Sequence, residues 1–493
     1  MKFLPNRRSG LFLLFCLAVL TPACSTKKRA QGDGAERKTV SAVSTKANAQ
    51  TRNAVRLGFE KELSRAYPVD APPATSSVTF ELLAKQSSVP RAGEGPLMVW
   101  SYNGQVPGPV LRVRLGQEVV VKLKNELPQP TTIHWHGVRV PNAMDGVPGV
   151  TQDAVPPGES FTYRFVPKDA GTFWFHPHVR GAEQVERGLY GVLIVDDTEP
   201  LPYTKDEVWV LDDWRLGADG QIDPRFVTRH DLAHDGRWGK RITVNGDPSK
   251  ELLVRPGERI RLRLVNTSNA RVYRPDFTGL NAQVIAVDGM YSLRPLPAKD
   301  FELAPGNRLD LDILIPRTSP EKSIKITDRF SARRAYVLAS IRIEGEPVET
   351  PQFAPPSNTH IPQWNAAEKE KVDVTYVLNA RRGGKYGIQW TINGRPWGKH
   401  RITELSGGKW TKVRFKNDSG RLHPMHIHGQ FFKVIARNGK PVNIPYLRDT
   451  VLLHPRETLD IGMVPVDWGT WMMHCHILEH AEAGMMTTIE VAE

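Results

Sequence analysis

Short apolar runs rich in Val, Ile and Leu recur along the chain, and turns that contain Pro and Gly separate them. In some runs apolar and polar residues alternate, as in the segment from Ile260 to Val265. Alternation of this kind, bounded by turn residues, is typical of β-strands with one buried face. Long stretches with a helical period are scarce. The pattern therefore predicts an all-β chain.

A weak repeat divides this pattern into three copies. Each copy has an Asn-Gly pair, a glycine turn, an apolar run and a second Asn, and the copies start 142 and 148 residues apart. Chance recurrence of Asn-Gly turns is the alternative interpretation. The repeat predicts three copies of one antiparallel β-sandwich domain. The two asparagines of the successive copies are Asn103 and Asn125, Asn245 and Asn266, and Asn393 and Asn417.

The length of 493 residues agrees with this division, because a single core rarely serves so long a chain. We expect domains at residues 73–198, 199–350 and 351–493. Residues 25–55 are apolar-poor and rich in Lys, Ala, Ser and Thr. They predict a flexible tether over residues 25–72 that ends in a short helix before Tyr67.

The first 24 residues are typical of a secretory signal. Basic residues precede an apolar run at 11–20, which is too short to span a membrane. Cys24 follows Ala23 as in a bacterial lipoprotein cleavage site, so lipid attachment through Cys24 is expected, and ordinary signal cleavage nearby is the alternative. The protein is thus predicted to be exported, to the periplasm or the cell envelope.

The formal charge of +13 is concentrated at the N-terminus. Residues 1–70 hold 13 Lys and Arg against 5 Asp and Glu, so the remaining 423 residues are only mildly basic. A basic tether and leader do not make a nucleic-acid surface. We therefore expect no nucleic-acid partner.

Histidines are clustered along the chain. Ten of the 15 fall in four short windows, and eight of these form His-x-His pairs. On a strand, each pair would place two imidazoles on one face. Neutral imidazole is a common ligand of copper, zinc and iron, so the pairs could hold three metal ions. The pairs are His134 and His136, His176 and His178, His426 and His428, and His474 and His476.

Cys475 lies between two of these histidines and is the only cysteine after residue 24. On a strand its thiol would point away from the face that carries His474 and His476. His423, His480 and Met485 complete a set of two imidazoles, a thiolate and a thioether, which is typical of a blue-copper electron-transfer site. Met486 is an alternative axial ligand.

The clustered histidines belong to the first and third copies of the repeat. The second copy has none at the equivalent offset, so we expect the second domain to space and support the others. The remaining histidines are interpreted as surface or core residues. They are His230, His234, His360, His400 and His454.

These motifs together resemble the multicopper oxidases, specifically laccase-like members with three domains. The resemblance covers about residues 75 to 493 and implies cupredoxin-like Greek-key domains, four copper ions and O2 as electron acceptor. It rests on the segments His134 to Gly137, Met144 to Gln152, His176 to His178, His423 to Gly429 and His474 to Met486.

The resemblance also implies a role for each ligand. A type 1 copper would be held by His423, Cys475 and His480, with Met485 axial. A type 2 copper would be held by His134 and His426. A pair of type 3 copper ions would be held by His136, His176, His178, His428, His474 and His476.

In two places the sequence departs from its relatives. Some bacterial relatives have Glu directly after the histidine that corresponds to His480, where this chain has Ala481. Asp145 and Glu482 are the candidates for a proton relay in its place. Cuprous oxidases of the family carry acidic and Met residues just before the histidine that corresponds to His423, and also a Met-rich insert. Here the segment from Asp418 to Leu422 precedes His423 and no Met-rich stretch occurs, which weakens a dedicated cuprous-oxidase interpretation.

The expected activity is that of a laccase-like oxidase. A phenol or aromatic amine would dock at an exposed edge of His423 or His480 and give up one electron. The electron would pass through Cys475, His474 and His476 to the three-copper group, where four electrons and four protons convert O2 to two waters. A monomer is expected.

Two other functions remain open. One is a metal-ion oxidase that acts on Cu(I) or Fe(II) in envelope metal tolerance. The other is a non-catalytic copper-binding protein. A copper nitrite reductase would leave four His-x-His pairs unexplained.

Overall fold

The computed structural model describes residues 56–493 except 57, 69, 92–93, 319–321, 332–334 and 363–369. The described residues all lie in one compact unit, Arg52–Glu493. The predicted signal at 1–24, with Cys24, and the tether up to residue 55 lie outside the described residues. Among the described helices, none has the length and apolar character needed to cross a membrane.

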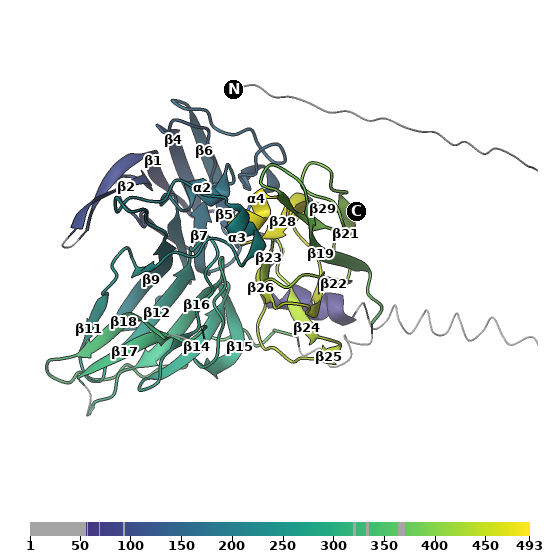
Figure 1. The fold of residues 1–493 in the computed structure, drawn as a ribbon. Coiled ribbons are helices and arrows are strands. Elements are labelled where there is room, and N and C mark those ends of the chain that lie inside the picture. The colour runs from purple at the N-terminus through teal and green to yellow at the C-terminus, as the bar shows by residue number, and fades with distance from the viewer. Residues whose placement is uncertain are drawn as a thin grey trace, which may run out of the picture. The chain divides into compact units, whose positions relative to one another are not determined.

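Two four-stranded sheets form the first domain (Figure 1). Their strand orders are β2-β1-β4-β6 and β3-β8-β7-β5. The strands are β1 (Ser76–Arg91), β2 (Glu94–Tyr102), β3 (Val110–Arg114), β4 (Gln117–Asn125), β5 (His134–His136), β6 (Ser160–Phe165), β7 (Gly171–His176) and β8 (Gly191–Asp196).

The second domain pairs a six-stranded sheet with a four-stranded sheet. Their orders are β10-β9-β12-β16-β14-β15 and β11-β18-β17-β13. The strands are β9 (Lys205–Trp214), β10 (Arg241–Val244), β11 (Glu251–Val254), β12 (Arg259–Asn266), β13 (Pro275–Asp276), β14 (Asn281–Val287), β15 (Met290–Pro297), β16 (Arg308–Leu314), β17 (Ser323–Asp328) and β18 (Tyr336–Ile343).

The third domain has sheets of six and five strands, in the orders β20-β19-β22-β27-β24-β25 and β21-β29-β28-β23-β26. The strands are β19 (Val374–Arg382), β20 (Ile388–Ile392), β21 (Thr403–Ser406), β22 (Thr411–Asn417), β23 (His423–Ile427), β24 (Lys433–Arg437), β25 (Lys440–Pro441), β26 (Thr450–Leu453), β27 (Thr458–Met463), β28 (Gly469–Cys475) and β29 (Met486–Ala492).

The all-β prediction is therefore confirmed, and the internal repeat is visible in the strand pairing. Each sheet also contains one parallel pair, and these pairs recur in the same way in every domain. They are β1 with β4, β9 with β12 and β19 with β22 in one set of sheets, and β3 with β8, β11 with β18 and β21 with β29 in the other. The sandwiches are thus mixed rather than purely antiparallel.

The Asn-Gly turns show why the repeat is not a chance recurrence. Asn103, Asn245 and Asn393 all adopt a left-handed backbone, with φ of 57°, 54° and 52°. Each side-chain oxygen accepts a hydrogen bond of 2.7 Å from a backbone N–H of the first strand of the same domain. Asparagine tolerates this conformation and mimics a backbone partner, so the same turn follows the second strand of the first hairpin in each domain.

Residues 58–66 are helical, as expected just before Tyr67, and they pack against the third domain. Phe59 and Tyr67 are buried in the core that contains Trp410. The rings of Phe59 and Trp410 lie 4.7 Å apart, and the Glu60 carboxylate accepts a hydrogen bond from the Trp410 backbone N–H. The end of the predicted tether is therefore part of the folded body.

Four short helical segments join the strands near the histidines. They are η1 (Asn142–Met144), α2 (Gly181–Gln184), α3 (Arg229–Ala233) and α4 (Leu478–Glu482). In the third domain, α4 directly follows the Cys475 strand, and α2 from the first domain and α3 from the second both contact it.

Candidate metal centre

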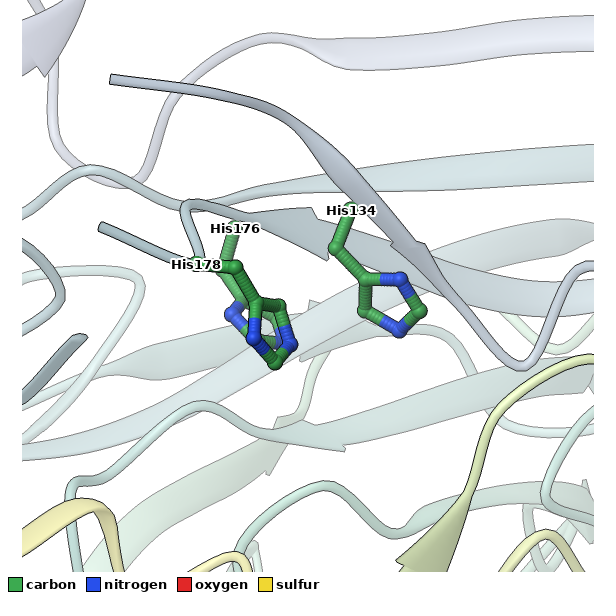
Figure 2. A group of neighbouring side chains, drawn as sticks. All are labelled: His134, His176 and His178. Carbon is green, nitrogen blue, oxygen red and sulfur yellow. The ribbon is translucent and has the colours of Figure 1, made fainter. Parts of the chain in front are cut away.

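The four His-x-His pairs converge on one place. β5 pairs with β7, so that His134 lies opposite His176, and β23 pairs with β28, so that His426 lies opposite His474. Figure 2 shows the side chains of His134, His176 and His178 in the first domain, and their ligand atoms lie within 4.8 Å of one another. The first and third domains thus each supply two pairs to one buried histidine cluster, as the sequence predicted.

Within this histidine cluster the ligand atoms fall into groups in which all lie within 4.8 Å of one another. Two of these groups of three share no member and divide the six predicted type 3 histidines equally; we call them the two triads. His134 and His426, the predicted type 2 pair, share a group with His136. The triads are His136, His176 and His476, and His178, His428 and His474.

Most of these imidazoles use one nitrogen to hold their orientation. The Nδ1 atom of His134 lies 2.9 Å from the backbone carbonyl of Asp145. The Nδ1 atom of His428 lies 2.8 Å from the carboxylate of the same residue. His426 Nδ1 lies 3.0 Å from the carbonyl of Asp449. Such contacts to the second ring nitrogen fix the tautomer and the ring direction of metal-binding histidines.

The remaining nitrogens are buried and have no hydrogen-bond partner among the described residues. Buried polar atoms are rarely left unpaired, because each costs about 1–3 kcal/mol. A metal cluster would explain why several unpaired ring nitrogens lie together at one place. A purely structural role for these histidines would not explain it. The atoms are Nε2 of His134, His176, His178, His426, His428 and His474, Nδ1 of His136, and both nitrogens of His476.

Burial also keeps these rings neutral. It lowers the pKa of His136, His176, His178, His426, His428 and His476 well below the usual value, and neighbouring histidines lower it further. For His474, burial lowers the pKa to about 4. Neutral imidazole is the form that binds metal ions, so the cluster is ready for metal at neutral pH.

A second group lies on the other face of the Cys475 strand. The Cys475 sulfur is 3.6 Å from His423 Nδ1 and 4.0 Å from His480 Nδ1, and all three side chains are buried. Burial raises the pKa of the Cys475 thiol and lowers that of His480 to about 3. Met485 is fully buried in the same core cluster. The alternation expected for His474, Cys475 and His476 is thus observed.

The prediction that a substrate docks at an exposed edge of His423 or His480 is wrong. His423 and His480 are both 0% exposed, and their outer nitrogens are already bonded. His423 Nε2 lies 2.9 Å from the Ser419 hydroxyl, and His480 Nε2 lies 3.0 Å from the backbone carbonyl of His234. Because α3 of the second domain covers this group, the three-domain packing closes the edge that a single domain would leave open.

The second domain also supports the histidine cluster from behind. The guanidinium of Arg308, fully buried, donates 3.0 and 2.7 Å hydrogen bonds to the two oxygens of Asp449. Thr450 is next in sequence, and its hydroxyl lies 3.0 Å from His426 Nδ1 and 3.1 Å from His136 Nε2. The ion pair between Arg308 and Asp449 is therefore a specific contact through which the second domain supports the histidine cluster.

Glycines allow this close approach. Gly137 and Gly306 both have positive φ, of 82° and 88°. A Cβ on Gly137 would lie 2.2 Å from the Arg308 guanidinium, and one on Gly306 would lie 2.8 Å from the His136 ring. A side chain at either position would displace the residues that hold the histidines.

The two proton-relay candidates differ in their contacts. Asp145 is buried and contacts both His428 and His134. Glu482 instead accepts a 3.4 Å hydrogen bond from Tyr386, and burial raises its pKa. Among the contacts of the described residues, Asp145 is thus the candidate that reaches the histidine cluster.

Sequence reasoning missed the roles of Ser419, Arg308 and Asp449, because nothing in their local sequence marks them. His234 was interpreted as a surface or core histidine, and its contact with His480 is made by the backbone carbonyl, which any residue type could supply.

Comparison with known families agrees with this geometry. Three models described as multicopper oxidase match residues 84–200, 206–318 and 369–493. One match falls on each sandwich, which supports cupredoxin-like domains. The chain therefore belongs to the multicopper oxidases, copper-dependent oxidoreductases that use O2.

Individual relatives span almost the whole described chain. The multicopper oxidase mco of Staphylococcus epidermidis is 31% identical over 79% of this chain and 83% of its own length. A multicopper oxidase structure from Pseudomonas thermotolerans has a TM-score of 0.74 and 34% identity, covering 86% of this chain and all of that one. A Campylobacter jejuni structure, described as a metallo-oxidase, has a TM-score of 0.72 and 26% identity, covering 87% and 97%.

Proposed function

We propose that this chain binds four copper ions and couples the oxidation of a one-electron donor to the reduction of O2 to two waters. The observation that carries the proposal is the strand that bears Cys475 on one face and His474 and His476 on the other, with a separate buried ligand set on each side. Copper held there would supply one-electron redox chemistry and enough stored electrons to reduce O2 fully.

The residues define the two sites. His423, Cys475 and His480, with Met485, would hold the type 1 copper, because thiolate and thioether select copper over zinc or hard cations. His134 and His426 would hold the type 2 copper. The two triads would each hold one type 3 copper. Cys475 joins the two sites through its own peptide bonds to His474 and His476.

Asp145 is proposed to act near the cluster as a proton-holding group. Its carboxylate bonds to His428 and lies 3.0 Å from His134 Nδ1, so it stands next to the proposed type 2 and type 3 ligands. Glu482 stays a candidate for moving protons at the outer end of α4, where Tyr386 is its partner.

For the donor, burial of the type 1 group supports reduced metal ions over phenols. Both imidazoles are covered, so a bulky ring cannot contact them directly. The description of the Campylobacter relative as a metallo-oxidase points the same way. Phenols and aromatic amines remain the second candidate, because outer-sphere electron transfer requires only proximity and a suitable potential.

Export to the periplasm or cell envelope, with a lipid anchor on Cys24, also remains part of the proposal and rests on the sequence of the first 24 residues. A soluble catalytic body tethered outside the cytoplasm would meet both O2 and reduced metal ions. Globomycin treatment of producing cells, followed by the mass of the mature protein, would test the anchor.

Oxygen consumption tests the activity. We expect copper-loaded protein to consume one O2 for every four donor electrons without releasing peroxide. His176→Ala should stop O2 uptake while the blue absorption of the Cys475 group persists, because His176 belongs to a triad on the other face of the strand. His360→Ala is the matched control at an exposed histidine. Bound copper without O2 uptake in the wild type would instead favour the non-catalytic copper protein.

A further inference from the structure

The third domain contains a strongly basic stretch that the mild net charge of the folded body conceals. Residues 374–416 hold ten Lys and Arg and one acidic residue, Glu404. Residues 71–493 as a whole hold 53 Lys and Arg against 48 Asp and Glu, so the rest of this range is slightly acidic. The stretch begins with β19 and runs through β20 and β21 to β22. Positive charge is thus concentrated on one domain.

Six of these cations lie at the β19–β20 hairpin and in the turn between β20 and β21. All six side chains are exposed, and none forms an ion pair with a carboxylate of the described residues. Where they form hydrogen bonds, the acceptor is neutral: Arg381 donates to the Gln389 side chain at 2.8 and 3.0 Å. We call these six residues the basic patch. They are Arg381, Arg382, Lys385, Arg395, Lys399 and Arg401.

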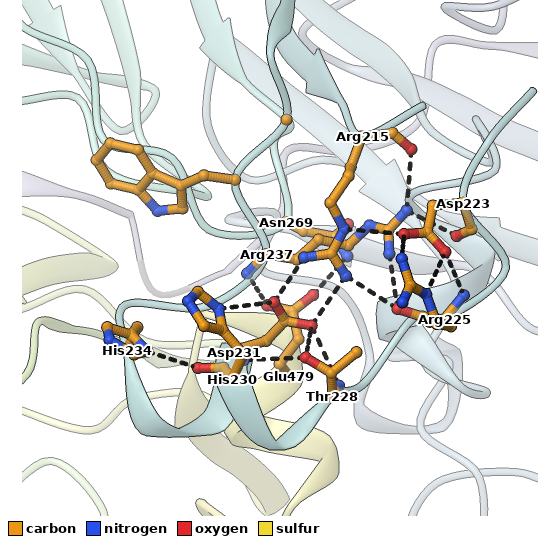
Figure 3. A network of polar contacts seen from close by, with 12 residues as sticks. Arg215, Asp223, Arg225, Thr228, His230, Asp231, His234, Arg237, Asn269 and Glu479 are labelled. Atoms are coloured by element: carbon orange, nitrogen blue, oxygen red, sulfur yellow. Dashed lines mark hydrogen bonds and ion pairs between the residues drawn. The ribbon is translucent and has the colours of Figure 1, made fainter. Parts of the chain in front are cut away.

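Many arginines elsewhere in the molecule are neutralised by carboxylates. At α3, the Arg215 guanidinium donates to both oxygens of Asp231, at 2.6 and 2.9 Å (Figure 3). In the third domain itself, Arg414 forms a 2.6 Å ion pair with Asp460. The basic patch has no such partner among the described residues, so its field acts on anions outside the molecule.

The two parts of the basic patch belong to one surface. The Arg381 guanidinium, on β19, reaches the Gly394 carbonyl in the turn after β20, at 3.5 Å. That turn is fixed to the body, because the Trp397 backbone N–H donates to the Gly484 carbonyl at 2.9 Å. The Trp397 indole also stacks on the His400 ring, with centroids 4.5 Å apart and planes inclined by 2°. The cations are therefore presented on a rigid support.

Three acidic side chains lie near the basic patch without pairing with it. Glu482 is half-buried, and its carboxylate already accepts a 3.4 Å hydrogen bond from Tyr386. Glu404 lies on β21, opposite Glu490 of β29. Six exposed cations thus outnumber the nearby carboxylates, and the surface stays positive.

Apolar side chains lie among the cations. Ile402 directly follows Arg401 and is 53% exposed, and Trp397 is half-buried two residues before Lys399. Cations next to exposed aliphatic and aromatic side chains are typical of surfaces that bind at a bilayer interface, where the cations meet lipid phosphates and the apolar groups enter the headgroup region. A nucleic acid would leave the exposed Ile402 without a role.

The expected tether would keep this surface close to a bilayer. A flexible chain of the 31 residues from 25 to 55 spans about 30 Å. The described body begins at Arg56, which donates a 3.0 Å hydrogen bond to Asp373, directly before β19. The basic patch starts at the other end of this nine-residue strand, about 30 Å away at about 3.3 Å per residue. The reach of the tether thus matches the distance to the patch.

We propose that the basic patch binds the anionic phospholipid surface of the bilayer to which the chain is tethered. A lipid anchor with a flexible tether fixes the distance of the body from the bilayer but leaves its orientation free. The basic patch fixes the orientation, with the β19–β20 hairpin against the headgroups. The proposal goes beyond the oxidase function and involves no copper ligand.

The test compares three full-length proteins: wild type, the patch variant Arg382→Gln/Lys385→Gln/Lys399→Gln/Arg401→Gln, and a control. The control neutralises four exposed lysines of the second domain by Lys240→Gln, Lys299→Gln, Lys322→Gln and Lys325→Gln. Binding is measured by co-sedimentation with vesicles of phosphatidylcholine alone and of an equimolar mixture with phosphatidylglycerol. We expect the patch variant to lose at least about tenfold in affinity for the mixed vesicles relative to the control. High salt should remove this difference.

Amide hydrogen exchange then locates the contact independently of the leader and the tether. Exchange in residues 381–402 should slow when mixed vesicles are added to wild type or control, and this protection should be lost in the patch variant. Protection that is absent from wild type, or that persists in the patch variant, would overturn the proposal. Equal loss of affinity in patch variant and control would do so as well, because total charge alone would then explain it.

A short DNA duplex separates the membrane from other polyanions. Patch-dependent binding of the duplex without patch-dependent binding of mixed vesicles would overturn the membrane role. O2 uptake by the copper-loaded proteins should be the same in all three, because the substituted residues contact no proposed copper ligand. Absence of O2 uptake in every protein would refute the proposed oxidase function and leave the vesicle result standing.

Discussion

The buried ion pair between Arg308 and Asp449 should be one of the most sensitive contacts in the molecule. Arg308 is fully buried and also donates to the backbone carbonyls of Thr172, at 3.1 Å, and Gly306, at 3.0 Å. It therefore joins all three domains at the back of the histidine cluster. Arg308→Met keeps an unbranched stem as far as the Nε position and removes every one of these hydrogen bonds.

The size of the destabilisation follows from the charge of Asp449, which stays buried after Arg308 is replaced. Breaking a buried pair by removing one partner costs about 3–5 kcal/mol, because the other charge stays buried without compensation. Replacing both partners by apolar residues is much closer to neutral. We therefore expect Arg308→Met to lose about 3–5 kcal/mol, and Asp449→Leu added to it to restore part of that loss.

Urea denaturation of the four metal-free proteins, followed by tryptophan fluorescence, gives the coupling energy of this double-mutant cycle. Copper content after dialysis gives a second readout. Arg308→Met should lose copper from the proposed type 2 position, because Asp449 and Thr450 orient His426. A change in stability below about 1 kcal/mol, with full copper content, would refute the reasoning.

Three further predictions concern stability. Burial raises the pKa of Glu186 to about 8, an effect that Arg237 opposes, so the folded state keeps a proton that the unfolded state releases. The free energy of unfolding should thus fall as the pH rises from about 5 to 8, by at most about 1.4 kcal/mol per pH unit. In urea titrations Glu186→Gln should reduce this dependence on pH. Phe59→Ala should loosen the 58–66 helix by about 3 kcal/mol, seen as roughly hundredfold faster amide exchange there; unchanged exchange would show that its packing on Trp410 is unimportant. Asn393→Ala should cost about 1–3 kcal/mol in thermal unfolding, because it forces Ala into a left-handed turn and removes two hydrogen bonds, whereas Asn393→Gly should cost less.

Local patterns could predict much of this structure. Strand alternation alone placed His474 and His476 on one face and Cys475 on the other, because side-chain direction in a strand depends only on position. The Asn-Gly turns predicted the repeat for the same reason: the left-handed backbone of Asn103 and its counterparts is a local property of the turn. The exact domain boundaries stay predictions.

Contacts between domains could not be predicted in this way. Arg308 and Asp449 are 141 residues apart, and His480 and His234 are 246 apart. Neither pair leaves a local pattern, since domain packing alone brings them together. This is also why the exposed substrate edge was wrong: a single third domain would present His480 to solvent, and the second domain covers it.

Cys475 is the residue on which the separation of the two proposed copper sites depends. Cys475→Ser removes only the thiolate that faces His423 and His480, and leaves the eight histidines on the other side in place. Copper analysis and a visible spectrum of the purified variant provide the measurement. We expect about three copper ions per chain instead of four, no blue absorption and no donor-driven O2 uptake. Blue absorption that persists in this variant would contradict the two-faced strand on which the account is built.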